Sequence, residues 1–82
     1  MEELITKIVS AIVDYPNDIS IQSIPGDHTV IYKLEVNAQD TGKVIGKQGR
    51  TADAIRTILK ALGGKQNKKI ILEIKDSLNP RS

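Results

Sequence analysis

Several residue types that often carry chemistry are missing or scarce in this chain. The sequence has no cysteine, no tryptophan and no phenylalanine, and its single histidine, His28, follows a Pro-Gly-Asp turn signal. Without cysteine, disulfides and thiolate metal sites are excluded. A lone histidine in a turn does not indicate a catalytic acid or base, and no acidic cluster has the spacing of metal ligands. We therefore expect no enzyme, no cofactor and no metal.

Signals for a membrane or secretory segment are also missing. No apolar run approaches the ~18 residues that a membrane-spanning helix needs. The chain begins with Met-Glu-Glu, whereas a signal peptide begins with positive charge. A chain of 82 residues suggests one domain that hides roughly 60% of its unfolded surface, which leaves no room for a large enclosed cavity. These features predict a small cytoplasmic domain.

Charge is distributed unevenly, although the net charge is only +2. Residues 1–42 carry seven acidic and two basic side chains, a net of −5, whereas residues 43–69 carry eight basic and one acidic, a net of +7. Such a block indicates a polyanion partner, although an ordinary solvated face has the same composition. The candidate contacts in it are Lys43, Lys47, Arg50, Arg56 and Lys69.

Apolar spacing predicts an α+β fold with the order α-β-β-α-α-β. Asn37, followed three residues later by Asp40, resembles a helix start and predicts a helix of about two turns. Gly63-Gly64 is predicted to end the last helix. The predicted elements are a helix at 2–14, strands at 19–24 and 29–36, a short helix from 37, a helix from 50 to about 62, and a strand at 68–75.

The segment KVIGKQGR, residues 43–50, places two glycines between the last two predicted helices. It fails the Walker A pattern, because the fifth residue after Gly42 is a lysine, and it fails the Rossmann pattern, because Val44 stands where a glycine is required. Glycines at 46 and 49 permit a sharp turn and close approach of a ligand backbone, and the next helix directs free N–H groups outward. The alternative is a bare corner that uses glycine for tight packing.

Basic side chains at this turn suit a phosphodiester. Lys47 and Arg50 supply positive charge beside the glycines, and Val44 and Ile45 offer an apolar wall for bases. Aromatic stacking platforms are missing, because Tyr15 and Tyr32 are the only aromatic residues and are expected to serve in packing. Bases would then be held by aliphatic contacts and hydrogen bonds, and one such domain would bind weakly.

A Gly-x-x-Gly turn between helices, preceded by Val-Ile, resembles the KH domain, whose loop clamps about four nucleotides of a single strand. Two strands before the loop and one after it are similar to the type II fold, a three-stranded sheet with helices packed on one face. The stretches VDYPNDI, GKVIGKQGRTADAIRTIL and KKIILEI resemble the KhpA family of small bacterial KH proteins. The resemblance implies one KH domain, which we expect over residues 1–77. A short flexible tail is expected at 78–82, because chain ends that follow a strand-ending Asn-Pro are commonly frayed.

The resemblance also implies a function and a site. It implies single-stranded RNA binding as an RNA chaperone or post-transcriptional regulator, self-association or pairing with a larger Jag-type KH protein, and links to cell shape and cell-wall biogenesis. The competing interpretation is a protein interaction module whose basic face meets an acidic partner. The predicted RNA-binding residues are Lys43, Val44, Ile45, Gly46, Lys47, Gln48, Gly49, Arg50, Arg56 and Lys69.

The helix from Arg50 carries more apolar surface than packing on one sheet requires. The surplus lies along Ala54, Ile58 and Ala61, and two copies of this flank could approach closely across a two-fold axis. The sequence therefore predicts a dimer interface there. The alternative is that the N-terminal helix of the same chain covers this flank.

Overall fold

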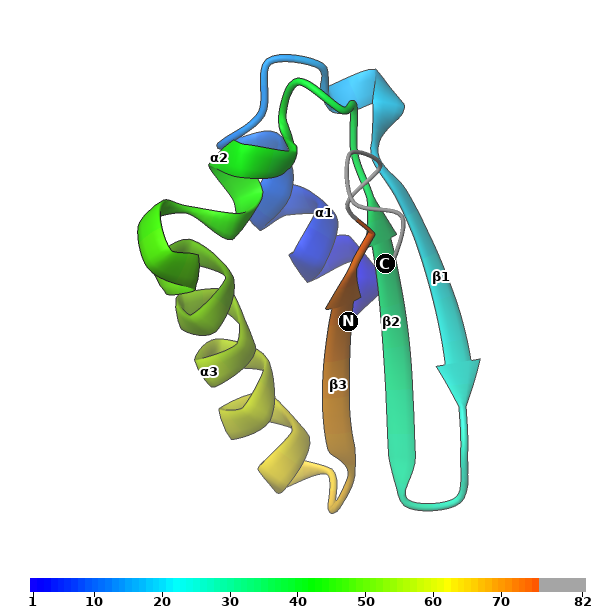
Figure 1. The fold of residues 1–82 in the computed structure, drawn as a ribbon. Helices are drawn as coiled ribbons and strands as arrows, with labels where there is room; N and C mark the ends of the chain where they lie inside the picture. The colour runs from blue at the N-terminus through cyan, green and yellow to red at the C-terminus, as the bar shows by residue number, and fades with distance from the viewer. Residues whose placement is uncertain (76–82) are drawn as a thin grey trace.

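The computed structural model describes residues 1–75. The expected tail at 78–82, and the last two residues of the expected domain, lie outside the described residues. The helices and strands follow one another in the predicted order α-β-β-α-α-β, with two short 3-10 turns added (Figure 1). They are α1 (Glu2–Ser10), η1 (Pro16–Asp18), β1 (Ser20–Pro25), β2 (Thr29–Glu35), α2 (Thr41–Ile45), η2 (Lys47–Gly49), α3 (Arg50–Lys65) and β3 (Lys69–Ile74).

The three strands form one sheet in the order β1-β2-β3. β1 and β2 form an antiparallel hairpin, with Ile21 opposite Leu34, whereas β3 returns parallel to β2, with Leu34 opposite Ile74. The parallel pairing requires a crossover, which α2 and α3 supply. β2 is therefore the central strand, and β3 lies at the edge beside α3 (Figure 1).

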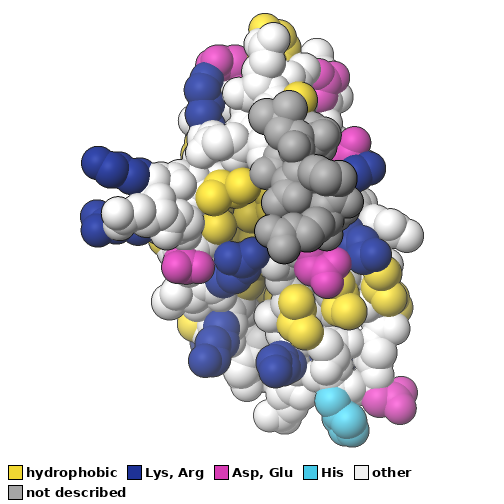
Figure 2. Space-filling model, in the orientation of Figure 1, with side chains coloured by type: hydrophobic (Ala, Val, Ile, Leu, Met, Phe, Trp, Pro, Cys, Tyr) yellow, Lys and Arg dark blue, Asp and Glu magenta, His cyan; other side chains and the backbone are white. Residues whose placement is uncertain are grey.

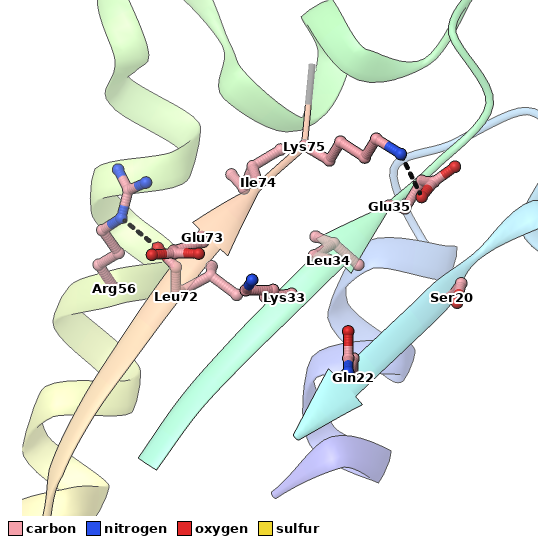
Figure 3. Close-up of a pocket in the computed structure, with 10 residues that line it drawn as sticks. All are labelled: Ser20, Gln22, Lys33, Leu34, Glu35, Arg56, Leu72, Glu73, Ile74 and Lys75. Atoms are coloured by element: carbon pink, nitrogen blue, oxygen red, sulfur yellow. Dashed lines mark hydrogen bonds and ion pairs between the residues drawn. The ribbon is translucent and has the colours of Figure 1, made fainter. Parts of the chain in front are cut away.

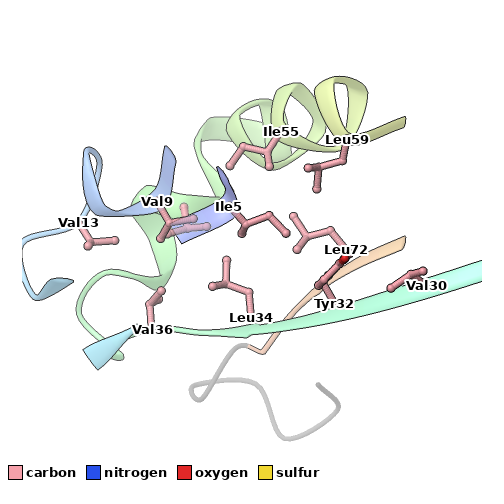
Figure 4. Close-up of a cluster of buried hydrophobic side chains, with 11 residues drawn as sticks. Ile5, Val9, Val13, Val30, Tyr32, Leu34, Val36, Ile55, Leu59 and Leu72 are labelled. Atoms are coloured by element: carbon pink, nitrogen blue, oxygen red, sulfur yellow. The ribbon is translucent and has the colours of Figure 1, made fainter. Parts of the chain in front are cut away.

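Both long helices pack on one face of the sheet, as predicted (Figure 4). Alternate residues of β2 point into the core, and one of them, Leu34, is fully buried. Full burial of a side chain of this size contributes roughly 1.5–3 kcal/mol. Around it pack Ile5 and Val9 of α1, Ile55 and Leu59 of α3, and Leu72 of β3. The other sheet face carries the alternating residues of the strands, and none of the described helices covers it.

The first helix is shorter than predicted. α1 ends at Ser10, and a turn follows in which Val9 O accepts hydrogen bonds from Ile12 N and Val13 N. Val13 is still buried, because the turn directs it back into the core. Apolar spacing alone extended the helix, since it does not distinguish a helical residue from a buried residue in the turn that follows.

The helix before the glycine turn is also shorter than predicted. α2 begins at Thr41, and Asp40, not Asn37, stands at its N-cap. The Asn37 side chain accepts a hydrogen bond from Gln39 N, so it closes a local turn instead of capping a helix. One helical turn then remains before Gly46.

The end of α3 corrects a further prediction. The helix continues through both glycines to Lys65, so Gly63-Gly64 is not its stop. Gly63 is buried, and a Cβ at this position would lie 2.5 Å from Lys68 O and 3.0 Å from Ile70 Cγ1. Glycine is needed here because the helix and the start of β3 lie in direct contact.

No helix among residues 1–75 is long and apolar enough to span a membrane.

Candidate nucleic-acid interface

The turn between α2 and α3 is built from left-handed backbone. Gly46 (φ 77°, ψ 173°), Gln48 (φ 58°) and Gly49 (φ 76°) all have positive φ. The conformation of Gly46 is accessible essentially to glycine alone, and Gln48 is one of two non-glycine residues with positive φ among residues 1–75. This run reverses the chain within four residues and exposes the tip.

The two glycines have different surroundings. A Cβ at Gly46 would lie 2.2 Å from Thr51 Oγ1 and 2.8 Å from Thr51 N, so this glycine is packed against the first turn of α3. A Cβ at Gly49 would have no atom within 4 Å. The backbone at Gly49 is therefore the part of the turn that a ligand can approach closely.

Two flexible side chains occupy the tip. Lys47 and Gln48 are exposed, and Arg50 is exposed immediately after them. Neither Lys47 nor Arg50 has an acidic partner among residues 1–75, and Arg50 Nη2 lies 3.4 Å from Gln48 Oε1. In Figure 2, basic side chains project at the left, where Figure 1 places this turn, and an apolar area lies beside them.

The predicted apolar wall is only half present. Ile45 is half-buried and borders the turn, whereas Val44 is fully buried in the core. The prediction that Val44 contacts bases is wrong, because α2 buries this side chain in the hydrophobic core, where a base cannot reach it. Val44 instead anchors α2, and so positions the turn that follows it.

Lys43 does not point freely to solvent. Its ammonium contacts Asp14 Oδ2 and lies 3.8 Å from Asp40 Oδ1. The pKa of Lys43 is raised above its ordinary value, and the largest cause is the hydrogen bond to Asp14. Desolvation lowers the pKa, whereas the negative charges of Asp14 and Asp40 raise it further. Lys43 is thus a candidate phosphate contact whose ammonium group already lies beside two carboxylates.

Arg56 is committed in part to the fold. Its Nε donates to Leu72 O at 3.2 Å (Figure 3). Its Nη1 lies 3.5 Å from Asp53 Oδ1. Leu72 lies on the edge strand β3, so Arg56 bridges the second turn of α3 and the sheet. The rest of the guanidinium is free to contact a ligand between α3 and β3.

Lys69 lies too far away to join this site. It opens β3 at the end of the sheet where α3 ends, while the glycine turn is at the start of α3 (Figure 1). A helix of 16 residues is roughly 24 Å long. This placement does not support the prediction that Lys69 acts with the turn. The basic residues are clustered in the sequence, but the length of α3 separates Lys69 from those at the turn.

A hollow formed by the described residues does not include the turn. It lies across the sheet near Ser20, Lys33 and Glu73, with Arg56 at its margin (Figure 3). Its charges are mixed, and Lys75 Nζ lies 3.4 Å from Glu35 Oε2. A hollow with charges of both signs has no preference for a polyanion, so the exposed turn remains the better candidate. Among the described residues there is no cluster of acidic or histidine side chains that could hold a metal.

Sequence reasoning missed the role of Asp40. Its side chain is fully buried, and its two oxygens accept hydrogen bonds from Asp14 N (3.1 Å) and Tyr15 N (3.0 Å). It was expected only as an acid at a helix start. The acid three residues after Asn37 was the available signal, but its partners lie about 25 residues earlier in the chain.

The predicted association flank is open. Ala54, Ile58 and Ala61 are exposed, and Ile58 is 47% accessible. The alternative that α1 covers this flank is wrong, because α1 packs on the sheet through Ile5 and Val9.

A three-stranded sheet in α-β-β-α-α-β order, with a Gly-x-x-Gly turn between α2 and α3, defines a type II KH domain. The family described as "KhpA/KhpB, KH domain" matches residues 2–74, and the chain belongs to that family. No solved structure matches the chain.

Curated relatives match over nearly their whole length. The chain is 54% identical to the RNA-binding protein KhpA of Listeria monocytogenes, over 90% of this chain and 97% of the relative. It is 47% identical to the protein of that name from Clostridium perfringens, over 90% and 99%, and 43% identical to the one from Chlamydia pneumoniae, over 90% and 95%. These relatives are named for RNA binding and not for catalysis.

Proposed function

We propose that this protein binds single-stranded RNA through the turn Gly46-Lys47-Gln48-Gly49. The observation that carries the proposal is the open backbone at Gly49, flanked by Lys47 and Arg50, in a family whose relatives are named RNA-binding proteins. A phosphate seated over Gly49 meets the first N–H groups of α3, which no side chain caps.

The bases then lie between α3 and the edge strand β3. Half-buried Ile45 supplies an apolar contact, and Arg56 supplies hydrogen-bond donors farther along the helix. No aromatic residue is placed in this groove, since Tyr32 is buried and Tyr15 lies on the linker after α1. Because stacking contributes about 1–3 kcal/mol per base in aromatic binders, we expect modest affinity from one domain.

Reversing the charge of the tip tests the proposal. The double variant Lys47→Asp, Gln48→Asp should remove binding of a fluorescent single-stranded RNA, because two carboxylates would face the phosphates. Both residues are exposed, and aspartate tolerates the left-handed backbone at position 48, so stability should change by no more than about 0.5 kcal/mol. Fluorescence anisotropy and urea unfolding measure the two quantities.

A matched control is available after α3. Gln66→Asp with Lys68→Asp changes the same residue types and the same charge at exposed positions at the opposite end of the helix. This control should retain most of the affinity. If both double variants bind equally well, or lose binding equally, the turn is not the site.

We also propose that the RNA-binding unit is a dimer, formed through Ala54, Ile58 and Ala61 with a second copy or with a larger Jag-type KH protein. The exposed isoleucine between two small residues supports this surface. Linked sites would offset the weak affinity of each domain, as an RNA chaperone or regulator requires. The competing function is binding of an acidic protein by the same basic face. Copurification of RNA that nuclease removes would favour RNA binding over this alternative.

A further inference from the structure

The linker between α1 and β1 is fastened to the segment that leads into α2. Besides the two backbone hydrogen bonds to Asp40, Tyr15 Oη lies 3.3 Å from Gln39 Oε1, and Asn37 Nδ2 lies 2.8 Å from Asp18 Oδ2. These contacts fix the linker beside the helix that ends at Gly46. A side chain that the linker directs toward α2 is therefore kept close to the side chains of α2.

Asp14 is the side chain that this arrangement directs at Lys43. Its backbone N–H is bound to Asp40, and its own carboxylate contacts Lys43 Nζ. The two carboxylates near Lys43 differ in freedom. Asp40 is buried with both oxygens engaged, whereas the Asp14 side chain is 68% accessible and Lys43 is its ion-pair partner among residues 1–75. Asp14 is thus the member that can move away.

Lys43 would meet an RNA backbone that continues from the turn along α2. It lies on α2 three residues before Gly46, which corresponds to a rise of roughly 4.5 Å along a helix. Lys47 and Arg50 have no acidic partner among residues 1–75, so of the basic residues around the turn Lys43 alone is paired in this way. Pairing with Asp14 offsets part of the attraction that Lys43 offers to a phosphate.

We infer that Asp14 competes with an RNA phosphate for Lys43, and so limits how far the bound strand extends past the turn along α2. The inference rests on the proposed function. In free protein the Asp14 carboxylate takes the position of the phosphate, and binding at Lys43 requires its displacement. Exposed ion pairs of this kind change an equilibrium by about 1.4- to fivefold, which sets the size of the effect.

The variant Asp14→Asn tests this competition. The asparagine keeps the backbone N–H that binds Asp40 but carries no charge. We expect a gain of about 1.4- to fivefold in affinity for a single-stranded RNA oligomer long enough to pass Lys43. The slope of log affinity against log salt should become steeper by up to ~0.7, because one more phosphate is neutralised.

Two further variants separate local competition from general charge. Asp18→Asn removes the same charge from the same linker without touching Lys43, and it should change neither affinity nor slope by as much. In the double variant Asp14→Asn, Lys43→Gln the gain should disappear, because the released cation is gone. If the gain persists in that double variant, or if Asp14→Asn and Asp18→Asn act alike, Asp14 is only a distant charge and the inference is overturned.

The same titration distinguishes this inference from the proposed function. If the Lys47→Asp, Gln48→Asp variant loses binding while Asp14→Asn behaves as the parent protein, only the competition is refuted. If the tip variant keeps full affinity, the proposed site itself fails. Circular dichroism of each variant tests whether the fold is intact. The single variant Lys43→Gln, in which the linker is unchanged, is the reference for the affinity of the double variant.

Discussion

At the scale of single residues, the glycine turn divides its tasks between two glycines that look equivalent in the sequence. Gly46 is held in a conformation open to glycine alone and packs on Thr51, whereas Gly49 has a left-handed conformation and open space. The first glycine makes the turn, and the second leaves room for a ligand. The sequence motif predicted a sharp turn and a close approach of a ligand backbone, but not which glycine serves which purpose. That difference depends on the position of Thr51, which packs against Gly46.

Alanine at each glycine should separate these tasks. Gly46→Ala should cost at least about 3 kcal/mol of stability, because backbone strain adds to overlap with Thr51. Gly49→Ala should cost about 1–2 kcal/mol, the penalty of a left-handed L-residue, and yet remain folded. Its RNA affinity should nonetheless fall, since a methyl group occupies the approach to the backbone.

Urea unfolding and RNA anisotropy on the same samples provide the comparison. Unchanged RNA affinity in folded Gly49→Ala would mean that the ligand backbone does not approach this residue. Comparable stability of the two alanine variants would show that Gly46 is not packed as described.

At the scale of elements, the sequence predicted the order and type of all six helices and strands, and missed mainly where they end. The strand predicted at 29–36 is present as β2, because period-two patterns depend only on the local chain. The linker after α1 depends on a distant partner, because the Asp40 carboxylate binds Asp14 N and Tyr15 N. Gly63, expected to end α3, lies inside the helix and packs against the backbone of Lys68 at the start of the next strand. The burial of Val44 and the pairing of Lys43 were unpredictable for the same reason.

The paired glycines near the end of α3 allow a test of that explanation. Gly64→Ala should stabilise the protein by about 0.4–1 kcal/mol, because this position is helical and a Cβ has no neighbour within 4 Å. Gly63→Ala should destabilise it by about 1–3 kcal/mol, because the added methyl overlaps Lys68 O. Thermal unfolding of both variants decides the matter, and a shift in the same direction for both would show that the contact with Lys68 is not limiting.

At the scale of the whole molecule, the exposed flank of α3 is the surface through which we propose that two copies pair. Because Ile58 is not buried in the chain, Ile58→Asp should leave the fold intact. We expect the parent protein to sediment as a dimer and this variant as a monomer with weaker RNA affinity, since linked sites lose their avidity.

Ile24→Asp provides the control, because Ile24 is a comparably exposed isoleucine on β1, away from α3. This control should sediment as the parent does. A parent protein that is monomeric at all concentrations, or an Ile58→Asp dimer, would place the interface elsewhere or remove it.

The parallel pairing of β2 with β3 has a consequence for synthesis of the chain. β3 is the last described element, and α2 and α3 both lie between it and its partner strand β2 in the chain, so the sheet cannot be completed while these helices are still the newest part of the chain. Until β3 arrives, Arg56 lacks the Leu72 carbonyl, and one edge of the central strand is unpaired. The glycine turn is therefore translated before the strand that completes the proposed binding surface, and we expect a nascent chain to acquire RNA binding only when its final strand has emerged.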